Sequence, residues 1–275
     1  MSAGDIYNRI NDMDGSVVEK IIQRLEFRDS DPLFTQWREQ YLDKLPLIRA
    51  TNILEVGCGT GVVTRAIANR PEVAGHIIGS DYSPALIAAA QDKAKDAGLD
   101  GRIDFRVGDI HNLAFEDGLF DIVIAHTVVS HISSPDKAIK ELGRVVKPGG
   151  WIAIFDGDYA SITFAYPDDQ FAKQVEDAFV SMVANNPRIM RQLPHLLANG
   201  GLAIRDLDAY VLTEVGTSRF WMSAIETYTP MMAQSNLLPE DKLNSWLTWQ
   251  RQASELNYFF GSCNYFVYLV RHPGN

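Results

Sequence analysis

The stretch that decides the fold is ILEVGCGTG at residues 53–61. Its first half is apolar and rich in β-branched side chains, which is typical of a buried parallel strand. Three glycines then fall within five residues, where the backbone can turn tightly and a ligand can lie against bare main chain. Residues 62–70 read as a helix that ends before Pro71. Strand, glycine loop and helix in this order predict the ligand-binding corner of an open α/β sheet.

Composition limits the classes of protein to consider. The chain has 275 residues, is 46% hydrophobic and carries a formal net charge of -10, which suits one large domain. The acidic balance argues against nucleic acid as a partner, because such binding needs clustered Lys and Arg. No apolar run reaches the ~20 residues of a membrane span, and the polar N-terminus does not resemble a signal peptide. With only Cys58 and Cys263 as cysteines, we expect a cytoplasmic protein without a disulfide.

Strand and helix patterns alternate after the glycine loop. Further strands are expected at residues 76–81, 103–107, 120–125 and 151–155, and Ser-Pro pairs at positions 83 and 134 are typical helix starts. Repeated strand–helix units predict a doubly wound, mostly parallel sheet with helices on both faces.

Two regions flank this α/β core. Residues 1–50 read as helical, with an aromatic stripe that either packs on the core or forms a lid over the site. Residues 157–275 hold helical insertions rich in Met and aromatic side chains, with strands expected at 205–212 and 263–270. Because no linker separates these parts, we expect a single domain over residues 1–275, with the ligand-binding core at 51–156.

Acidic residues stand at the ends of two expected strands. Asp81 follows the glycine loop by about twenty residues, where a carboxylate can accept hydrogen bonds from both hydroxyls of a ribose. Tyr82 beside it can pack on an adenine face. Asp109 ends the next strand, where it can accept a hydrogen bond from an adenine amino group. The sequence therefore predicts a nucleoside ligand at this edge.

Five segments in this order carry a family resemblance: ILEVGCGTG, GSDYSPALI, VGDIHNLAF, FDIVIAHTVVSHI and ELGRVVKPGGWIAIFD. In this combination the chain resembles the class I S-adenosylmethionine-dependent methyltransferases over residues 50–156. The resemblance implies a Rossmann-like sheet of seven strands with the last strand antiparallel. It also implies S-adenosyl-L-methionine as the cofactor and residues 51–156 as the part that binds it. The remaining half of the chain matches no pattern.

The resemblance carries roles for individual residues. The loop glycines would line the methionine part of the cofactor, Glu55 would support the loop or reach the methionine amine, and the backbone at 125–126 would face the methionine end. Tyr7 would close over the cofactor, judged from its position alone. The implied cofactor-binding set is Tyr7, Glu55, Gly57, Cys58, Gly59, Gly61, Asp81, Tyr82, Asp109, Ile110, Ala125 and His126.

The loop suits this cofactor better than a dinucleotide. Val62 and Thr64 stand where a GxGxxG motif would need its last glycine. S-adenosylmethionine has no pyrophosphate that must lie at a helix N-terminus. Its sulfonium and amine instead suit nearby carboxylates.

Methyl transfer by in-line displacement needs mainly a positioned nucleophile. His131 is the candidate general base for an acceptor that must lose a proton, and the alternatives are a structural role in the loop or contact with the substrate. Asp156 and Asp158 follow the fifth expected strand, where they can anchor a cationic substrate, accept a proton or only complete a turn. The sequence shows no assembled metal-ligand cluster.

The predicted acceptor is an oxygen or nitrogen atom of a small organic molecule, aromatic or lipophilic. No Asn-Pro-Pro-Tyr or Asp-Pro-Pro-Tyr follows the fourth strand and no Pro-Cys nucleophile is present, which argues against nucleobase and glutamine targets. A homodimer is a further expectation. Open alternatives are a cofactor-binding protein that transfers no methyl group, a methyltransferase acting on carbon, RNA or protein, and a Rossmann dehydrogenase. The candidate substrate-binding residues are Asp156, Tyr159, Trp221 and Tyr228.

Overall fold

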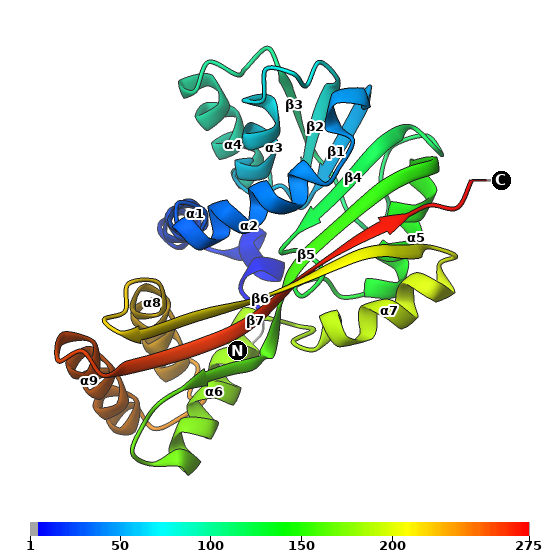
Figure 1. The fold of residues 1–275 in the computed structure, drawn as a ribbon. Coiled ribbons are helices and arrows are strands. Elements are labelled where there is room, and N and C mark those ends of the chain that lie inside the picture. Colours follow the sequence, from blue (N-terminus) through cyan, green and yellow to red (C-terminus); the bar gives the residue numbers. More distant parts are fainter. Residues whose placement is uncertain (1–4, 275) are drawn as a thin grey trace.

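A seven-stranded sheet forms the centre of the computed structural model, which describes residues 5–274 (Figure 1). The strand order is β3-β2-β1-β4-β5-β7-β6. Strands β1 to β5 pair in parallel, whereas β7 runs antiparallel to both of its neighbours, β5 and β6. This confirms the expected Rossmann-like sheet with an antiparallel last strand. The bounds are β1 Asn52–Val56, β2 His76–Asp81, β3 Ile103–Val107, β4 Phe120–His126, β5 Val146–Phe164, β6 Ala203–Gly216 and β7 Phe259–Arg271.

The strand order changes direction between β1 and β4. The chain adds β2 and β3 on one side of β1 and then crosses to add β4 on the other side. The loops that leave β1 and β4 therefore diverge and leave a crevice at the carboxyl ends of these strands. The glycine loop follows β1 at this point, so the fold places it at the position where open α/β sheets bind ligands.

Helices cover both faces of the sheet. Side chains alternate between the two faces along each strand, so Ile53 of β1 joins one hydrophobic cluster while Leu54 and Val56 join the other. The first cluster includes side chains of α2, α3 and α4, and the second includes those of α5 and α7. These helices are α2 Pro32–Asp43, α3 Val62–Ala68, α4 Pro84–Asp96, α5 Pro135–Val145 and α7 Ile189–Asn199.

The fifth strand is much longer than the sequence analysis expected. It begins at Val146 and continues past residue 155 to Phe164, because its second half pairs with β7. The expectation that Asp156 and Asp158 stand in a turn after this strand was therefore wrong, since both lie within β5. The extended β5, β6 and β7 carry a second group of helices at one end of the molecule (Figure 1): α6 Asp169–Val183, α8 Phe220–Gln234 and α9 Glu240–Glu255.

The N-terminal segment lies between this second group of helices and the helices α3 and α4 (Figure 1). It comprises the 3-10 helix η1, Tyr7–Asp12, and the helix α1, Gly15–Asp29; a short turn, η2 Leu47–Arg49, leads into β1. The backbone N–H of Ile6 donates to the carbonyl of Met182 in α6 at 3.3 Å. This hydrogen bond attaches the segment to the second group of helices.

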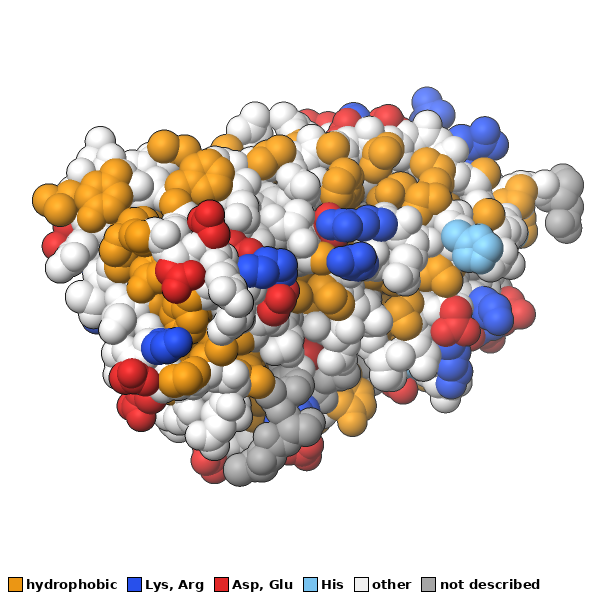
Figure 2. All heavy atoms as spheres, turned by 90° about the horizontal axis from the view of Figure 1, so that it is seen from below, with side chains coloured by type: hydrophobic (Ala, Val, Ile, Leu, Met, Phe, Trp, Pro, Cys, Tyr) orange, Lys and Arg blue, Asp and Glu red, His pale blue; other side chains and the backbone are white. Residues whose placement is uncertain are grey.

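The surface carries mixed charge and one apolar edge. On the face in Figure 2, Lys and Arg side chains of the described residues lie scattered among acidic ones and form no continuous basic groove. Strand β6 is an edge strand that exposes Leu207, Val211 and Val215; the expected homodimer stays a prediction. Within residues 5–274, no helix is both long and apolar enough to cross a membrane.

Candidate functional site

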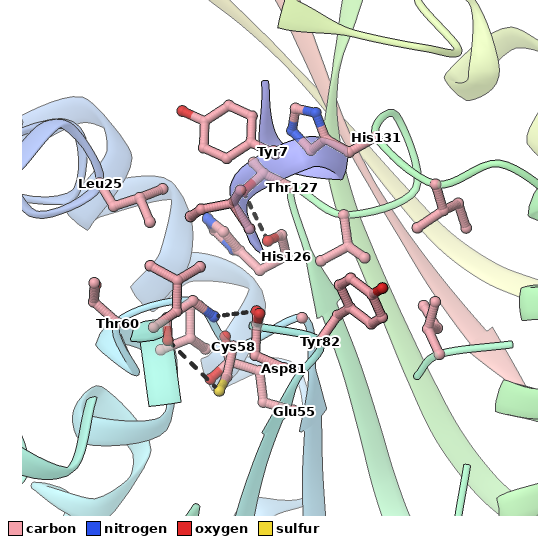
Figure 3. A pocket seen from close by; sticks show the side chains of 18 of the residues that line it. Tyr7, Leu25, Glu55, Cys58, Thr60, Asp81, Tyr82, His126, Thr127 and His131 are labelled. Atoms are coloured by element: carbon pink, nitrogen blue, oxygen red, sulfur yellow. Dashed lines mark hydrogen bonds between the residues drawn. The ribbon is translucent and has the colours of Figure 1, made fainter. Parts of the chain in front are cut away.

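A cavity of about 340 Å³ lies at the crevice beside the glycine loop (Figure 3). Its volume falls in the ~300–1,000 Å³ range of small-molecule sites. Ten of the twelve residues expected to bind the cofactor line it, and the exceptions are Gly61 and Ala125. Ala125 is fully buried within β4, and Gly61 directly precedes α3. Each of them is next in the sequence to a residue that lines the cavity but does not line it itself.

Each glycine of the loop is needed for its own structural reason. Gly57, Gly59 and Gly61 all have positive φ, between 53° and 77°, which side chains rarely adopt. A Cβ atom at Gly57 would lie 2.3 Å from the side chain of Val128, and one at Gly61 would lie 2.7 Å from the ring of Phe105. At Gly59 the nearest atom would be 3.4 Å away. The first and third glycines permit close packing of the loop, and the second mainly permits its turn.

Asp81 connects β2 to the glycine loop. Its carboxylate accepts a hydrogen bond from the backbone N–H of Gly59 at 2.8 Å (Figure 3). It accepts another from the backbone N–H of Ser83 at 2.9 Å. Burial raises the pKa of Asp81, and these N–H groups oppose that shift. A carboxylate has about four acceptor sites, so Asp81 can brace the loop and still bind a ligand hydroxyl.

Asp109 and His111 form a second polar pair in the cavity wall. The Asp109 carboxylate accepts from the backbone N–H of His111 at 2.9 Å and lies 2.7 Å from its Nδ1. Burial tends to raise the pKa of Asp109, but the hydrogen bonds from His111 lower it overall. The Nε2 atom of His111 is buried without a partner. The sequence analysis identified Asp109 and missed His111.

Glu55 is buried beneath the loop. Its carboxyl group bonds to the hydroxyl of Thr64 in α3. Burial raises the pKa of Glu55 to about 8, although the bond from Thr64 opposes the shift. At neutral pH this side chain is therefore mostly protonated, and its bonding supports the bracing role among the two expected for it.

His126 lies at the end of β4 in a neutral form. Its Nδ1 is 2.9 Å from the hydroxyl of Tyr41, and its ring stacks on Phe155 at 4.4 Å between centroids. Burial lowers the pKa of His126 well below the ordinary value, with Arg28 and Arg38 adding to the effect. The residue after it, Thr127, has φ 54°, an outlier for a β-branched side chain. The chain is thus strained where it borders the cavity, as is common at binding sites.

His131 is paired with an acidic residue that the sequence analysis missed. Its Nδ1 lies 2.7 Å from a carboxylate oxygen of Asp5, which is 1% exposed. The same carboxylate group accepts from the backbone N–H of Asn185 and of Tyr7. Burial tends to lower the pKa of His131, but the charge and hydrogen bond of Asp5 raise it overall. The pair joins the N-terminal segment to the loop after β4.

Arg28 of α1 is the third residue that the sequence analysis missed. It is the only Arg or Lys among the described residues that line this cavity. Its Nε is buried without a hydrogen-bond partner, and within residues 5–274 its guanidinium forms no salt bridge. The carboxylate next to it in the chain, Asp29, binds Arg38 at 2.6 Å. A cation without a salt-bridge partner among the described residues therefore lines the ligand site.

A smaller cavity of about 40 Å³ adjoins the first one. Three of the four residues expected to bind substrate line it: Tyr159, Trp221 and Tyr228. Asp156 lines neither cavity, so the expected contact of Asp156 with substrate was wrong. Its carboxylate is fully buried and accepts from the backbone and hydroxyl of Ser130 and from the N–H of Gly157.

The two cavities share a wall. Four described residues line both of them, namely Tyr7, Leu25, Arg28 and His131. Figure 3 shows Tyr7, Leu25 and His131 together at the end of the larger cavity that lies away from Glu55. The rings of Tyr7 and His131 lie 4.6 Å apart between centroids. A group passing from one cavity to the other would cross at these side chains.

Comparison with known proteins identifies the class. Residues 54–154 match the family described as "Methyltransferase domain". The chain is 27% identical over 143 residues to the ubiquinone/menaquinone biosynthesis C-methyltransferase UbiE of Idiomarina loihiensis, covering 52% of this chain and 54% of that protein. It is 30% identical over 141 residues to norajmaline N-methyltransferase of Rauvolfia serpentina, covering 51% of this chain and 47% of that protein.

A solved structure shows that the similarity of the fold extends over most of the chain. It is that of a putative methyltransferase from Bacillus halodurans C-125, which has a TM-score of 0.62 and 17% identity and covers 86% of this chain and 98% of the other. The fold and the site define a Rossmann-like methyltransferase domain. Residues 54–154 match a methyltransferase domain family, in agreement with the sequence resemblance to the class I S-adenosylmethionine-dependent methyltransferases. The chain spans about half the length of the two curated relatives.

The larger cavity fits the cofactor of this family. Thr60 Oγ1, His111 Nε2, His126 Nε2 and Arg28 Nε are buried polar atoms without partners, and all four residues line the cavity. Such atoms need a hydrogen-bonding ligand or water. Backbone at Gly57 and Gly59 is bare on the same wall. Donors, acceptors, carboxylates and one cation are thus available for a nucleoside joined to a charged amino acid.

Proposed function

We propose that this protein transfers a methyl group from S-adenosyl-L-methionine to an oxygen or nitrogen atom of a small organic acceptor. The observation that carries the proposal is the pair of adjoining cavities with His131 at their common wall and Asp5 hydrogen-bonded behind it. The cofactor, when bound, supplies a methyl group already activated on a sulfonium. A carbon nucleophile is the second candidate, because UbiE is by name a C-methyltransferase.

The protein's own residues would hold the cofactor along the edge of the sheet. Asp81 would accept from the ribose and Asp109 from the adenine amino group, while Tyr82, 58% exposed at the rim, would cover the base. The bare backbone of Gly57 and Gly59 would lie against the methionine part.

His131 is suited to act as the general base. A carboxylate only accepts hydrogen bonds, so the pairing with Asp5 places the proton of neutral His131 on Nδ1 and leaves Nε2 to receive one. Asp5 orients the ring and favours its protonated form, as the aspartate does in other His–Asp pairs. His126 is a poorer candidate, because burial lowers its pKa and its Nδ1 is bonded to Tyr41.

The proposal is tested first by binding and then by turnover. Calorimetry with S-adenosylhomocysteine should show binding, and incubation of the protein with methyl-labelled S-adenosylmethionine and a metabolite pool should produce a labelled small molecule. Binding without any labelled product would favour a protein that uses the fold without methyl transfer. Absence of binding to S-adenosylhomocysteine would contradict the proposal.

Replacing Asp81 with alanine should weaken the binding of S-adenosylhomocysteine by about 1–3 kcal/mol, because the ribose hydroxyls and the N–H of Gly59 lose their acceptor. Isothermal titration calorimetry measures the change. Asp100→Ala removes a carboxylate from an exposed loop outside the cavity and serves as the control. Equal affinities of Asp81→Ala and the unaltered protein would remove Asp81 from the site.

A further inference from the structure

The smaller cavity combines aromatic rings with positive charge. Its described lining contains two arginines, Arg24 and Arg28, one turn apart on α1, and no Asp or Glu. Most of the remaining wall consists of aromatic rings, all buried except the partly buried Tyr7. These are Tyr7, Tyr159, Phe179, Phe220, Trp221, Tyr228 and Tyr265.

The tyrosines do not neutralise this charge. Burial raises the pKa of Tyr159 and Tyr228 well above the ordinary value, and it also raises the pKa of Tyr265. All three are therefore neutral phenols at physiological pH. The nearby carboxylate of Asp5 lies behind His131 and does not line the cavity.

Arg24 has no carboxylate partner among residues 5–274. One of its Nη atoms donates to the hydroxyl of Ser223 at 3.2 Å, and its guanidinium lies 4.6 Å from the ring centroid of Phe220. Glu26, two residues further along α1, pairs with Arg65 and Lys93 instead. Arg24 is thus held in place by neutral groups and keeps its charge for another ligand.

One residue of the same lining also carries an unsatisfied donor. Trp221 is 2% exposed, and its Nε1–H has no hydrogen-bond partner within the part of the chain that the structure describes. A buried donor without an acceptor is costly, so such groups usually meet a ligand or water. Trp221 adjoins Phe220, the residue whose ring lies under Arg24.

From this arrangement we propose that the methyl acceptor carries an anionic oxygen group, a carboxylate or a phosphate, bound by Arg24 and Trp221 and joined to an apolar body held by the rings. The inference rests on the proposed function and names its substrate class. The nucleophile of the acceptor would reach the shared wall at His131. Cationic amines are disfavoured, because both arginines repel them.

The small size of this cavity limits what it can admit without a movement of its wall. A volume of about 40 Å³ suffices for roughly one or two waters and not for an aromatic ring. The wall must therefore open to admit the acceptor. Tyr7 of η1 is in that wall, and its hydroxyl lies 3.5 Å from that of Tyr228, so movement of the N-terminal segment would enlarge the space.

The test uses four probes of one shape on protein saturated with S-adenosylhomocysteine, whose own binding is measured first. They are 3-phenylpropionate, 2-phenylethyl phosphate, neutral 3-phenylpropanamide and cationic 3-phenylpropylamine. Calorimetry should show one or both anions binding about 10- to 100-fold more tightly than the amide, with the amine weakest. The stronger of the two anions identifies the carboxylate or the phosphate as the group recognised.

Variants assign this preference to Arg24. Arg24→Gln should remove the difference between anion and amide while leaving the affinity for the amide unchanged, and Arg24→Lys should keep part of it. Arg219→Gln is the matched control, because Arg219 is exposed and lines neither cavity. Equal affinity for all probes, no binding by any of them, or an anion preference that survives in Arg24→Gln would overturn the inference. Intact binding of S-adenosylhomocysteine in those cases would leave the proposed function standing.

Discussion

Replacing His131 with alanine is expected to lower the turnover number by about 10²- to 10⁴-fold, the range that a positioned general base contributes. Cofactor affinity should change little, because the adenine and ribose contacts proposed above do not involve this residue. The measurement is methyl transfer from labelled S-adenosylmethionine to the acceptor found in the metabolite screen, with calorimetry of S-adenosylhomocysteine alongside. His195→Ala on α7, outside both cavities, is the control.

The pH profile separates a base from a structural residue. His131 accepts a proton only when it is neutral, and Asp5 raises its pKa above the ordinary value of 6.5. The rate should therefore fall as the pH drops through that raised pKa. Asp5→Asn removes the charge that raises it, so the acid limb of the profile should move to lower pH. A limb that stays in place, or full activity of His131→Ala at every pH, would reject the base role.

The same ion pair ties the N-terminal segment to the core. A group whose pKa is raised in the folded state stabilises that state below its unfolded pKa, and the contribution is lost as pH rises through the folded pKa. The attachment of Asp5 to protonated His131 therefore weakens toward higher pH, where neutral His131 would be ready to act as a base. Both the loosening of the N-terminal segment and the deprotonation that lets His131 act as a base are therefore expected as the pH rises.

The motifs predicted the larger cavity well because they are local. A strand, a glycine loop and a strand-end carboxylate each need only a few neighbouring residues, so Gly57, Asp81 and Asp109 could be identified from spacing alone. The parallel core followed from the same alternation of strands and helices. The length of β5 could not, because its second half is a strand only through pairing with β7, about a hundred residues away.

Apart from His111, the residues that were missed come from outside the motifs. Asp5, Arg24 and Arg28 approach the site only because η1 and α1 pack across the crevice, and no local pattern specifies that contact. A signal was present in α1, where Arg24 and Arg28 stand four residues apart and share a helix side with Ile21. Arginines on the side that carries buried residues are candidates for ligand contacts, but the apolar pattern alone does not reveal them.

Arg28→Gln is expected to weaken the binding of S-adenosylhomocysteine by about 2–5 kcal/mol, the usual cost of removing one partner of a buried charge pair. The expected loss follows from the opposite charges of the cofactor and of Arg28. The amino-acid part of the cofactor carries a carboxylate, and Arg28 is the only Arg or Lys among the described residues lining the larger cavity. We propose that the two form an ion pair when the cofactor binds.

A truncated nucleoside makes this test specific. 5′-Methylthioadenosine has the adenine, the ribose and the sulfur but lacks the amino-acid part, so its affinity should be the same for Arg28→Gln and the unaltered protein. Arg28→Lys should recover part of the loss for S-adenosylhomocysteine, and Lys20→Gln, on the exposed side of the same helix, should show none. If Arg28→Gln weakens both nucleosides equally, the residue supports the fold of the site. If it weakens neither, its charge is available to the acceptor, and the two arginines of α1 would then act together on the anion inferred for the smaller cavity.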